Sequence, residues 1–155
     1  MFSFSAYADT KKDFETIATA VGFIDGGPKG AVQMDILYDA SNADSTAHAE
    51  EVAGIVAGGV GSKVKLTGNK ITSVDAATSK VIFVTRGAGS LYGAALAKAG
   101  ANGGLTVSTD MACLGGGCVL VVKTKPSVDI FVSSAAAGKT ATEFASAFSM
   151  MITKK

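Results

Sequence analysis

The sequence predicts a three-layer α/β domain with a mainly parallel sheet flanked by helices, a C-terminal antiparallel hairpin and a closing helix. Residues 81–85 are all β-branched or aromatic and show no polar alternation, which is typical of a strand buried on both faces. A glycine-rich turn and an alanine-rich helical pattern at residues 91–99 follow, which is the strand–turn–helix order of parallel sheets. Nearer the C-terminus, only residues 124–127 separate two further apolar runs. That connection is too short for a helical crossover, so the two runs should pair antiparallel.

Composition limits the domain count and the classes of partner. With 155 residues, a single domain over residues 9–155 is expected. The net charge is +1 and the lysines are scattered, so the basic stripe of a nucleic-acid-binding protein is missing from the sequence. No apolar run reaches the ~18 residues that a membrane span needs. A hydrophobic content of 48% with only 17% charged residues fits a buried sheet, and also a surface covered in a homo-oligomer.

Residues 1–8 resemble the end of a secretory signal peptide. Ala6-Tyr7-Ala8 has the small-x-small form of a cleavage site, which would make Asp9 the first residue of the mature chain. Export would place the protein in the periplasm. The alternative is an ordinary N-terminal segment.

The first half of the chain predicts two helices around a strand. A helix over residues 11–24, capped by Asp9 or Thr10, carries one apolar stripe at helical spacing. The members of this stripe are Phe14, Ile17, Ala18, Val21 and Ile24. Residues 32–38 form the first strand, in which Asp35 indicates an end or face that is not fully buried. A second helix follows over residues 46–57, with Asp44 or Ser45 as its cap.

The second half predicts further strands and a final helix. Residues 63–67 alternate and indicate a more exposed strand, which residues 70–74 either extend or follow as a second short strand. A brief helical turn is expected at residues 75–77 and a strand at residues 105–108. Residues 118–123 and 128–133 form the hairpin. The closing helix spans residues 141–152, capped by Thr140.

The sequence offers no catalytic constellation. His48 is the only histidine, so any triad or imidazole metal site must use it. It follows a helix pattern beside Glu50 and Glu51 with no second ligand at i+4, which favours a solvated helix histidine. No nucleophile elbow and no phosphate-binding lysine motif are present. We therefore predict no enzyme, no cofactor and no metal; the rival class is an enzyme that uses His48 or the cysteines.

A ligand site is predicted at the carboxyl edge of the sheet. Glycine turns let backbone amides approach a ligand, and the helix N-terminus favours an anion there. Arg86, the only arginine, would add a bidentate donor. The turns after the flanking strands should open on the same edge. The predicted ligand-binding residues are Tyr38, Asp39, Arg86, Gly87, Gly89, Ser90, Ser108 and Thr109. The alternatives are a tight turn with a surface arginine, or an apolar ligand held between sheet and helices.

Cys113 and Cys118 are the two cysteines of the chain, and three glycines lie between them. If the protein is exported, they should form a disulfide. In a reducing compartment they would stay free thiols. The pair lacks the second pair of ligands that a zinc site requires.

The C-terminal part resembles the YfiR-like (DUF4154) periplasmic proteins. The likeness lies in Leu105-Thr106-Val107-Ser108, in Cys113 and Cys118, and in the strand Val128-Asp129-Ile130-Phe131-Val132 followed by Phe144 and Met151. The resemblance implies a small regulator whose partner is an inner-membrane signalling protein, a diguanylate cyclase held inactive. It also implies disulfides that make the repression sensitive to redox state.

A second likeness concerns residues 36–56, ILYDASNADSTAHAEEVAGIV. This stretch is similar to the opening of one lobe of a type-1 solute-binding protein of a transport system. That likeness implies a small-molecule ligand at the carboxyl edge of the strands, and weak binding unless the lobe dimerises. The predicted function is therefore an exported, non-catalytic regulatory or binding protein.

Overall fold

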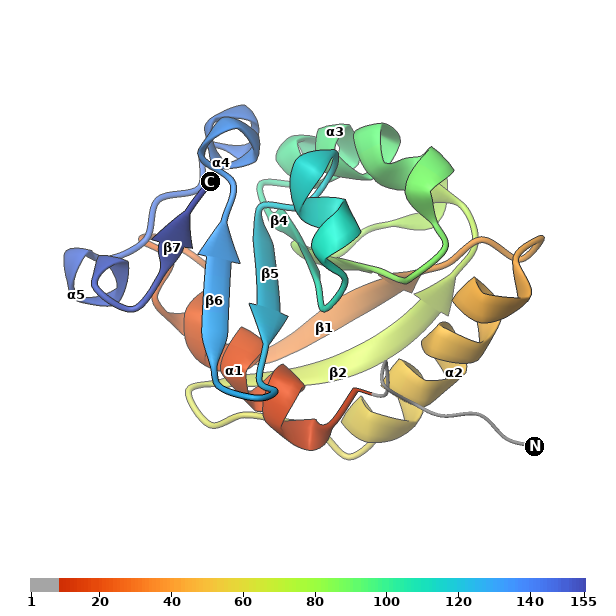
Figure 1. Cartoon of the computed structure of the whole chain (residues 1–155), viewed down its shortest axis with the longest axis horizontal. Coiled ribbons are helices and arrows are strands. Elements are labelled where there is room, and N and C mark those ends of the chain that lie inside the picture. Colours follow the sequence, from red (N-terminus) through yellow and green to blue (C-terminus); the bar gives the residue numbers. More distant parts are fainter. Residues whose placement is uncertain (1–8) are drawn as a thin grey trace.

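A computed structural model describes residues 9–155, which form a seven-stranded sheet in the order β2-β1-β3-β4-β5-β6-β7 (Figure 1). The strands are β1 Gly30–Leu37, β2 Val64–Ile71, β3 Val81–Val84, β4 Leu105–Ser108, β5 Leu120–Lys123, β6 Asp129–Val132 and β7 Thr153–Lys154. All pairs from β2 to β5 are parallel, β5 and β6 are antiparallel, and β7 runs parallel to β6. The predicted α/β fold with its antiparallel pair is confirmed. The predicted signal-peptide remnant at residues 1–8 lies outside the described residues.

Helices cover both faces of the sheet. They are α1 Lys11–Gly22, α2 Ala43–Val56, α3 Tyr92–Ala101, α4 Ser134–Thr140 and α5 Ser146–Ser149, with short 3₁₀ turns η1 Val74–Ala76, η2 Gly89–Leu91 and η3 Met111–Gly115. α1 and α2 pack on one face in a cluster that includes Phe14, Val52 and Phe83. Ala95 and Ala99 of α3 pack on the other face. No helix within residues 9–155 has the length and apolar character to cross a membrane.

The caps explain where the first two helices begin. Thr10 precedes α1, and its backbone N–H donates to the Asp13 carboxylate at 2.8 Å. α2 begins three residues before the predicted position because the cap is Asn42, whose side chain accepts from Ser45 N–H at 2.9 Å. The prediction of Asp44 or Ser45 as the cap was therefore wrong.

The central strands are buried as predicted. All four residues of β3 are buried, while β2 lies at the edge of the sheet, is largely exposed and extends to Ile71. Asp35 was wrongly taken as a sign of exposure. It is completely buried on β1, and its Oδ2 accepts from the backbone N–H of Thr78 and of Ser79, both at 2.9 Å. The carboxylate is satisfied by the turn that leads into β3.

The C-terminal region differs from the predicted helix over residues 141–152. A short helix, α4, forms instead before Ala141, and the Ser133 side chain caps it by accepting from Ala136 N–H. Ala141 adopts a left-handed conformation with φ 53°, which ends the helix, so Thr140 closes α4 rather than capping a new one. Phe148 is still buried and stacks on Phe23 with ring centroids 4.9 Å apart.

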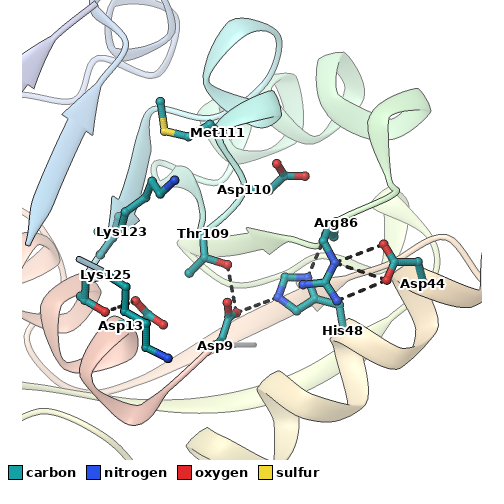
Figure 2. A pocket seen from close by; sticks show the side chains of 12 residues that line it. Asp9, Asp13, Asp44, His48, Arg86, Thr109, Asp110, Met111, Lys123 and Lys125 are labelled. Carbon is teal, nitrogen blue, oxygen red and sulfur yellow. Dashed lines mark hydrogen bonds and ion pairs between the residues drawn. The ribbon is translucent and has the colours of Figure 1, made fainter. Parts of the chain in front are cut away.

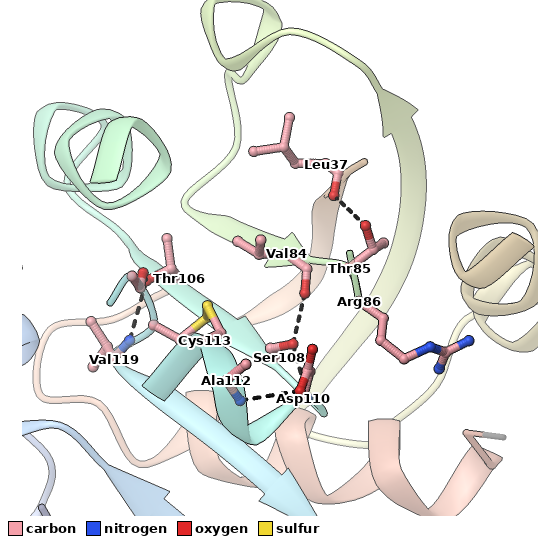
Figure 3. The surroundings of a disulfide bond; sticks show 12 residues. Leu37, Val84, Thr85, Arg86, Thr106, Ser108, Asp110, Ala112, Cys113 and Val119 are labelled. Carbon is pink, nitrogen blue, oxygen red and sulfur yellow. Dashed lines mark hydrogen bonds between the residues drawn. A yellow bond between two sulfur atoms is a disulfide. The ribbon is translucent and has the colours of Figure 1, made fainter. Parts of the chain in front are cut away.

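Cys113 and Cys118 form the predicted disulfide, with both residues completely buried (Figure 3). The bond closes η3 onto the start of β5. Three backbone N–H groups, including those of Gly117 and Cys118, donate to the Cys113 carbonyl. The Thr106 hydroxyl donates to the Gly117 carbonyl, and Val119 N–H donates to the Thr106 carbonyl at 3.0 Å. The bridge therefore fixes the segment between β4 and β5.

Replacing both cysteines by alanine should lower the free energy of unfolding by about 2 kcal/mol, because the unfolded chain loses a closed loop. Urea denaturation of the double variant and of the parent protein measures this difference. The presence of the disulfide is tested first. Both cysteines should resist alkylation in denatured, unreduced protein made in an oxidising compartment. Alkylation of both would contradict the bond.

Candidate functional site

A cavity of about 590 Å³ lies at the carboxyl ends of β3, β4 and β5, between the N-terminal ends of α1 and α2 (Figure 2). Its lining residues are Asp9, Asp13, Asp44, His48, Arg86, Thr109, Asp110, Met111, Val122, Lys123, Thr124 and Lys125. Five separate segments therefore contribute to one cavity. Parallel strands that end at one edge, flanked by helices that begin there, make this the expected place for a ligand in an α/β fold.

His48 is the buried centre of this cavity's wall, with 1% of its surface exposed. Its Nδ1 accepts from the backbone N–H of Arg86 at 2.9 Å, and its Nε2 lies 2.7 Å from Oδ2 of Asp9 (Figure 2). Because a backbone N–H can only donate, Nδ1 carries the lone pair and the Nε2 proton points to Asp9. The predicted solvated histidine was wrong, since α2 packs this face against Phe83.

Asp9 joins three segments of the wall. Its Oδ2 also accepts from the Thr109 hydroxyl at 2.9 Å, and its backbone N–H donates to Oε1 of Glu51 at 3.1 Å. The direction of these hydrogen bonds decides whether His48 could act as a catalytic base. Thr109 donates to Asp9 and not to His48, so the imidazole is not placed to take a proton from a hydroxyl nucleophile, as a triad requires.

The side chains of Asp9, His48 and Glu51 place one potential metal-ligand atom each within 4.8 Å of one another. A metal-bound histidine normally donates a hydrogen bond from its other ring nitrogen. In this site the other nitrogen, Nδ1, accepts from Arg86 N–H. Nε2 therefore holds a proton, and this arrangement does not fit a metal ion.

Arg86 lines the cavity through an anchored guanidinium. Its Nε lies 3.1 Å from Oδ2 of Asp44, and its Nη2 donates to Oδ1 of the same carboxylate at 3.3 Å. This two-nitrogen contact orients the planar group at the N-terminal end of α2. Arg86 follows β3, so the strand end and the helix start are joined across the cavity.

The structure brings only Arg86 and Thr109, of the predicted ligand-binding residues, into the lining of this cavity. Ser108 is completely buried, and its hydroxyl donates to the Val84 carbonyl at 2.6 Å. The carboxylate of Asp39 accepts hydrogen bonds from the Ser41 hydroxyl and from Ser41 N–H. Both bonds lower the pKa of Asp39, and the bond from the hydroxyl has the larger effect.

The remaining predicted residues lie around the first turns after β1 and β3. Gly87 adopts φ +79° against the Asn42 side chain, so its left-handed conformation and the close approach favour glycine. Gly89 and Ser90 belong to η2, which leads into α3, and Tyr38 packs against the apolar core. A ligand role for these four residues stays a prediction.

The aspartates and lysines that line the cavity were not among the predicted ligand-binding residues. Lys123 is the last residue of β5 and Lys125 follows it, and the parallel pairing of β5 with β4 brings both to the same edge. Asp13 is buried, and the Thr124 hydroxyl donates to its Oδ1 at 2.6 Å. Only the order of strands could have signalled this, since α1 precedes β1 but lies beside the end of β5.

The charges in the cavity are mixed. Four aspartates line it, and each accepts hydrogen bonds within the protein. Lys123 and Lys125 have no ion pair within residues 9–155. The pKa of nearby Tyr92 is raised, mainly because its side chain is partly buried and to a smaller extent because Asp110 is negatively charged. The cavity therefore offers ammonium groups at one end and satisfied carboxylates along its wall.

No model of a known protein family matches the sequence, and no curated protein matches it. Solved structures share the fold. One is the ligand-free, open structure of CD0873, a substrate binding protein with adhesive properties from Clostridium difficile, with a TM-score of 0.65 and 12% identity. The match covers 93% of this chain and 58% of that one.

Another is a conserved domain protein from Vibrio cholerae O1 biovar El Tor, with a TM-score of 0.58 and 12% identity over 93% of this chain and 59% of that chain. This chain thus spans less than two thirds of either protein. At such identities the likeness shows a shared α/β fold. The resemblance to YfiR-like proteins, and the periplasmic location it implies, stay predictions.

Proposed function

We propose that this chain is a non-catalytic binding domain that holds a small polar molecule in the cavity at the carboxyl edge of β3, β4 and β5. The observation that carries the proposal is the cavity itself. Its volume of about 590 Å³ is within the usual range for small-molecule sites. The segments that line it come from three strand ends and two helix starts, where α/β folds bind ligands.

The chemistry of the lining supports a polar, charged ligand over an apolar one. Arg86, Lys123 and Lys125 supply cationic donors. Asp110, whose Oδ1 accepts from Ala112 N–H at 3.1 Å, supplies a carboxylate to the same lining. A small molecule that carries an acidic group, with or without an amino group, fits this pattern of charges.

Two observations favour binding over catalysis. His48 is held between Arg86 N–H and Asp9, with no hydroxyl or thiol that donates to it among the described residues. Both cysteines are in the buried disulfide. The fold shared with a substrate binding protein also supports this class.

Replacing Arg86 by alanine should weaken ligand binding by 10- to 100-fold, or ~1.5–3 kcal/mol, the usual cost of a lost charged hydrogen bond. The ligand is first found by thermal-shift screening of small polar acids, amino acids and neutral metabolites, and its affinity is then measured by calorimetry. Lys80→Ala is the matched control, because Lys80 is exposed just before β3, at the opposite end of that strand. Unchanged affinity in Arg86→Ala would remove Arg86 from the site.

The same screen separates the two kinds of binding protein. Saturable binding of a small molecule supports the proposal if substitutions of the residues that line the cavity weaken that binding. A screen without any small-molecule binder, together with a membrane signalling protein recovered by cross-linking, would replace it with the regulator that the YfiR-like resemblance implies.

A further inference from the structure

The backbone nitrogen of Asp9 lies at a point of concentrated negative charge. It donates to Oε1 of Glu51 at 3.1 Å, and Asp9's own carboxylate lies close by, bonded to His48 and Thr109. Within residues 9–155, the Glu51 side chain has no other hydrogen-bond partner. His48 presents its Nε2 proton in the neutral tautomer, so two carboxylates meet there without a cation.

A metal ion does not supply the missing positive charge, because the Nε2 lone pair of His48 is occupied by a proton. The sequence directly before Asp9 suggests another source. Ala6-Tyr7-Ala8 has the small-x-small form that signal peptidases cut. Cleavage after Ala8 would make the nitrogen that already contacts Glu51 the N-terminus of the chain.

We propose that a peptidase hydrolyses the Ala8–Asp9 peptide bond and that the new α-ammonium group of Asp9 forms an ion pair with Glu51. In this step water breaks the C–N bond, its oxygen goes to the Ala8 carboxylate, and the Asp9 nitrogen becomes an amine that is protonated to an ammonium. No oxidant, reductant or cofactor takes part. The peptide N–H that donates to Glu51 is replaced by a charged N–H at the same place.

The geometry suits an ammonium group better than a peptide nitrogen. A peptide nitrogen has one N–H, which Glu51 already accepts, and carries no net charge. An ammonium has three N–H groups and a unit positive charge between two carboxylates, and charge-assisted hydrogen bonds are the stronger ones. All the helices and strands of the described structure lie within residues 9–155, so cleavage removes none of them.

The ion pair would act on the cavity wall. Asp9 is held at four places: by Glu51, by His48, by Thr109 and by the chain that leads into α1. His48 in turn accepts from the N–H of Arg86. Fixing the Asp9 nitrogen therefore fixes one side of the cavity, and processing would complete the wall that faces the ligand.

The first experiment determines the N-terminus of the protein recovered from the cells that naturally produce it. Intact-mass measurement and N-terminal sequencing should give a chain that starts at Asp9. A chain that retains Tyr7 and Ala8 would overturn the processing site. This result does not depend on ligand binding, so it is independent of the function proposed above.

The second experiment tests the ion pair itself. Glu51→Gln is made in the chain that starts at Asp9 and in the full chain, where Asp9 has a peptide nitrogen. Glutamine still accepts a hydrogen bond but has no charge, so the melting temperature should fall by about 3 °C more in the chain that starts at Asp9. Glu15→Gln, at an exposed position of α1, is the matched control and should shift both forms equally. Equal losses for Glu51→Gln in both forms would refute the pair.

Discussion

Replacing His48 by alanine should lower the free energy of unfolding by about 3 kcal/mol or more. The change removes the acceptor for the backbone N–H of Arg86 and one of the two side-chain donors to the Asp9 carboxylate. A buried polar group without a partner costs about 1–3 kcal/mol, and a charged one costs more. The ring also packs edge-on against Phe83 at 5.5 Å, so its loss leaves a cavity beside the core.

Urea denaturation and thermal melting measure this loss, and the melting temperature should fall by roughly 6–12 °C. Glu50→Ala is the control in the same helix, because Glu50 is exposed and its side chain pairs with Lys70 at the surface. That pair should be worth less than about 1 kcal/mol. Equal, small effects of both substitutions would mean that His48 is not a structural anchor of the cavity wall.

The fold could be predicted because its strands carry their own signal. The apolar run of β3 has no polar alternation, and the short connection between β5 and β6 excludes a helical crossover. The C-terminal helix was misplaced because the apolar spacing of Phe144, Phe148 and Met151 is also produced by a short helix followed by a strand. The left-handed Ala141 that ends α4 leaves no mark in the sequence, since alanine is a good helix former.

The candidate cavity lies at the edge of the sheet where the sequence predicts a ligand site, beyond the carboxyl ends of parallel strands. Of the predicted ligand-binding residues, only Arg86 and Thr109 line this cavity, and their role in binding stays a prediction. Asp9, His48 and Lys123 were missed because they come together only through the order of the strands and the docking of α1 beside β5. The charged neighbours Glu50 and Glu51 suggest that His48 is exposed. Its side chain is buried instead, because the face of α2 that carries it packs against the rest of the protein.

Asp35 shows the same limit at a buried strand. We expect Asp35→Ala to lower the free energy of unfolding by about 3 kcal/mol, because the N–H groups of Thr78 and Ser79 lose their acceptor inside the protein.

The other oxygen of Asp35 accepts from Asn69 Nδ2 at 3.2 Å, so the substitution also removes a side-chain hydrogen bond between β1 and the edge strand β2, which stay paired through their backbones. Hydrogen exchange of the Thr78 and Ser79 amides should quicken along with the global loss, since the turn into β3 depends on that carboxylate. Asp129→Ala is the matched control, an aspartate on strand β6 that is exposed, and it should change stability by less than about 0.5 kcal/mol. If the two aspartate variants are equally stable, the Asp35 carboxylate does not hold the turn, and the hydrogen bonds of Thr78 and Ser79 contribute no net stability.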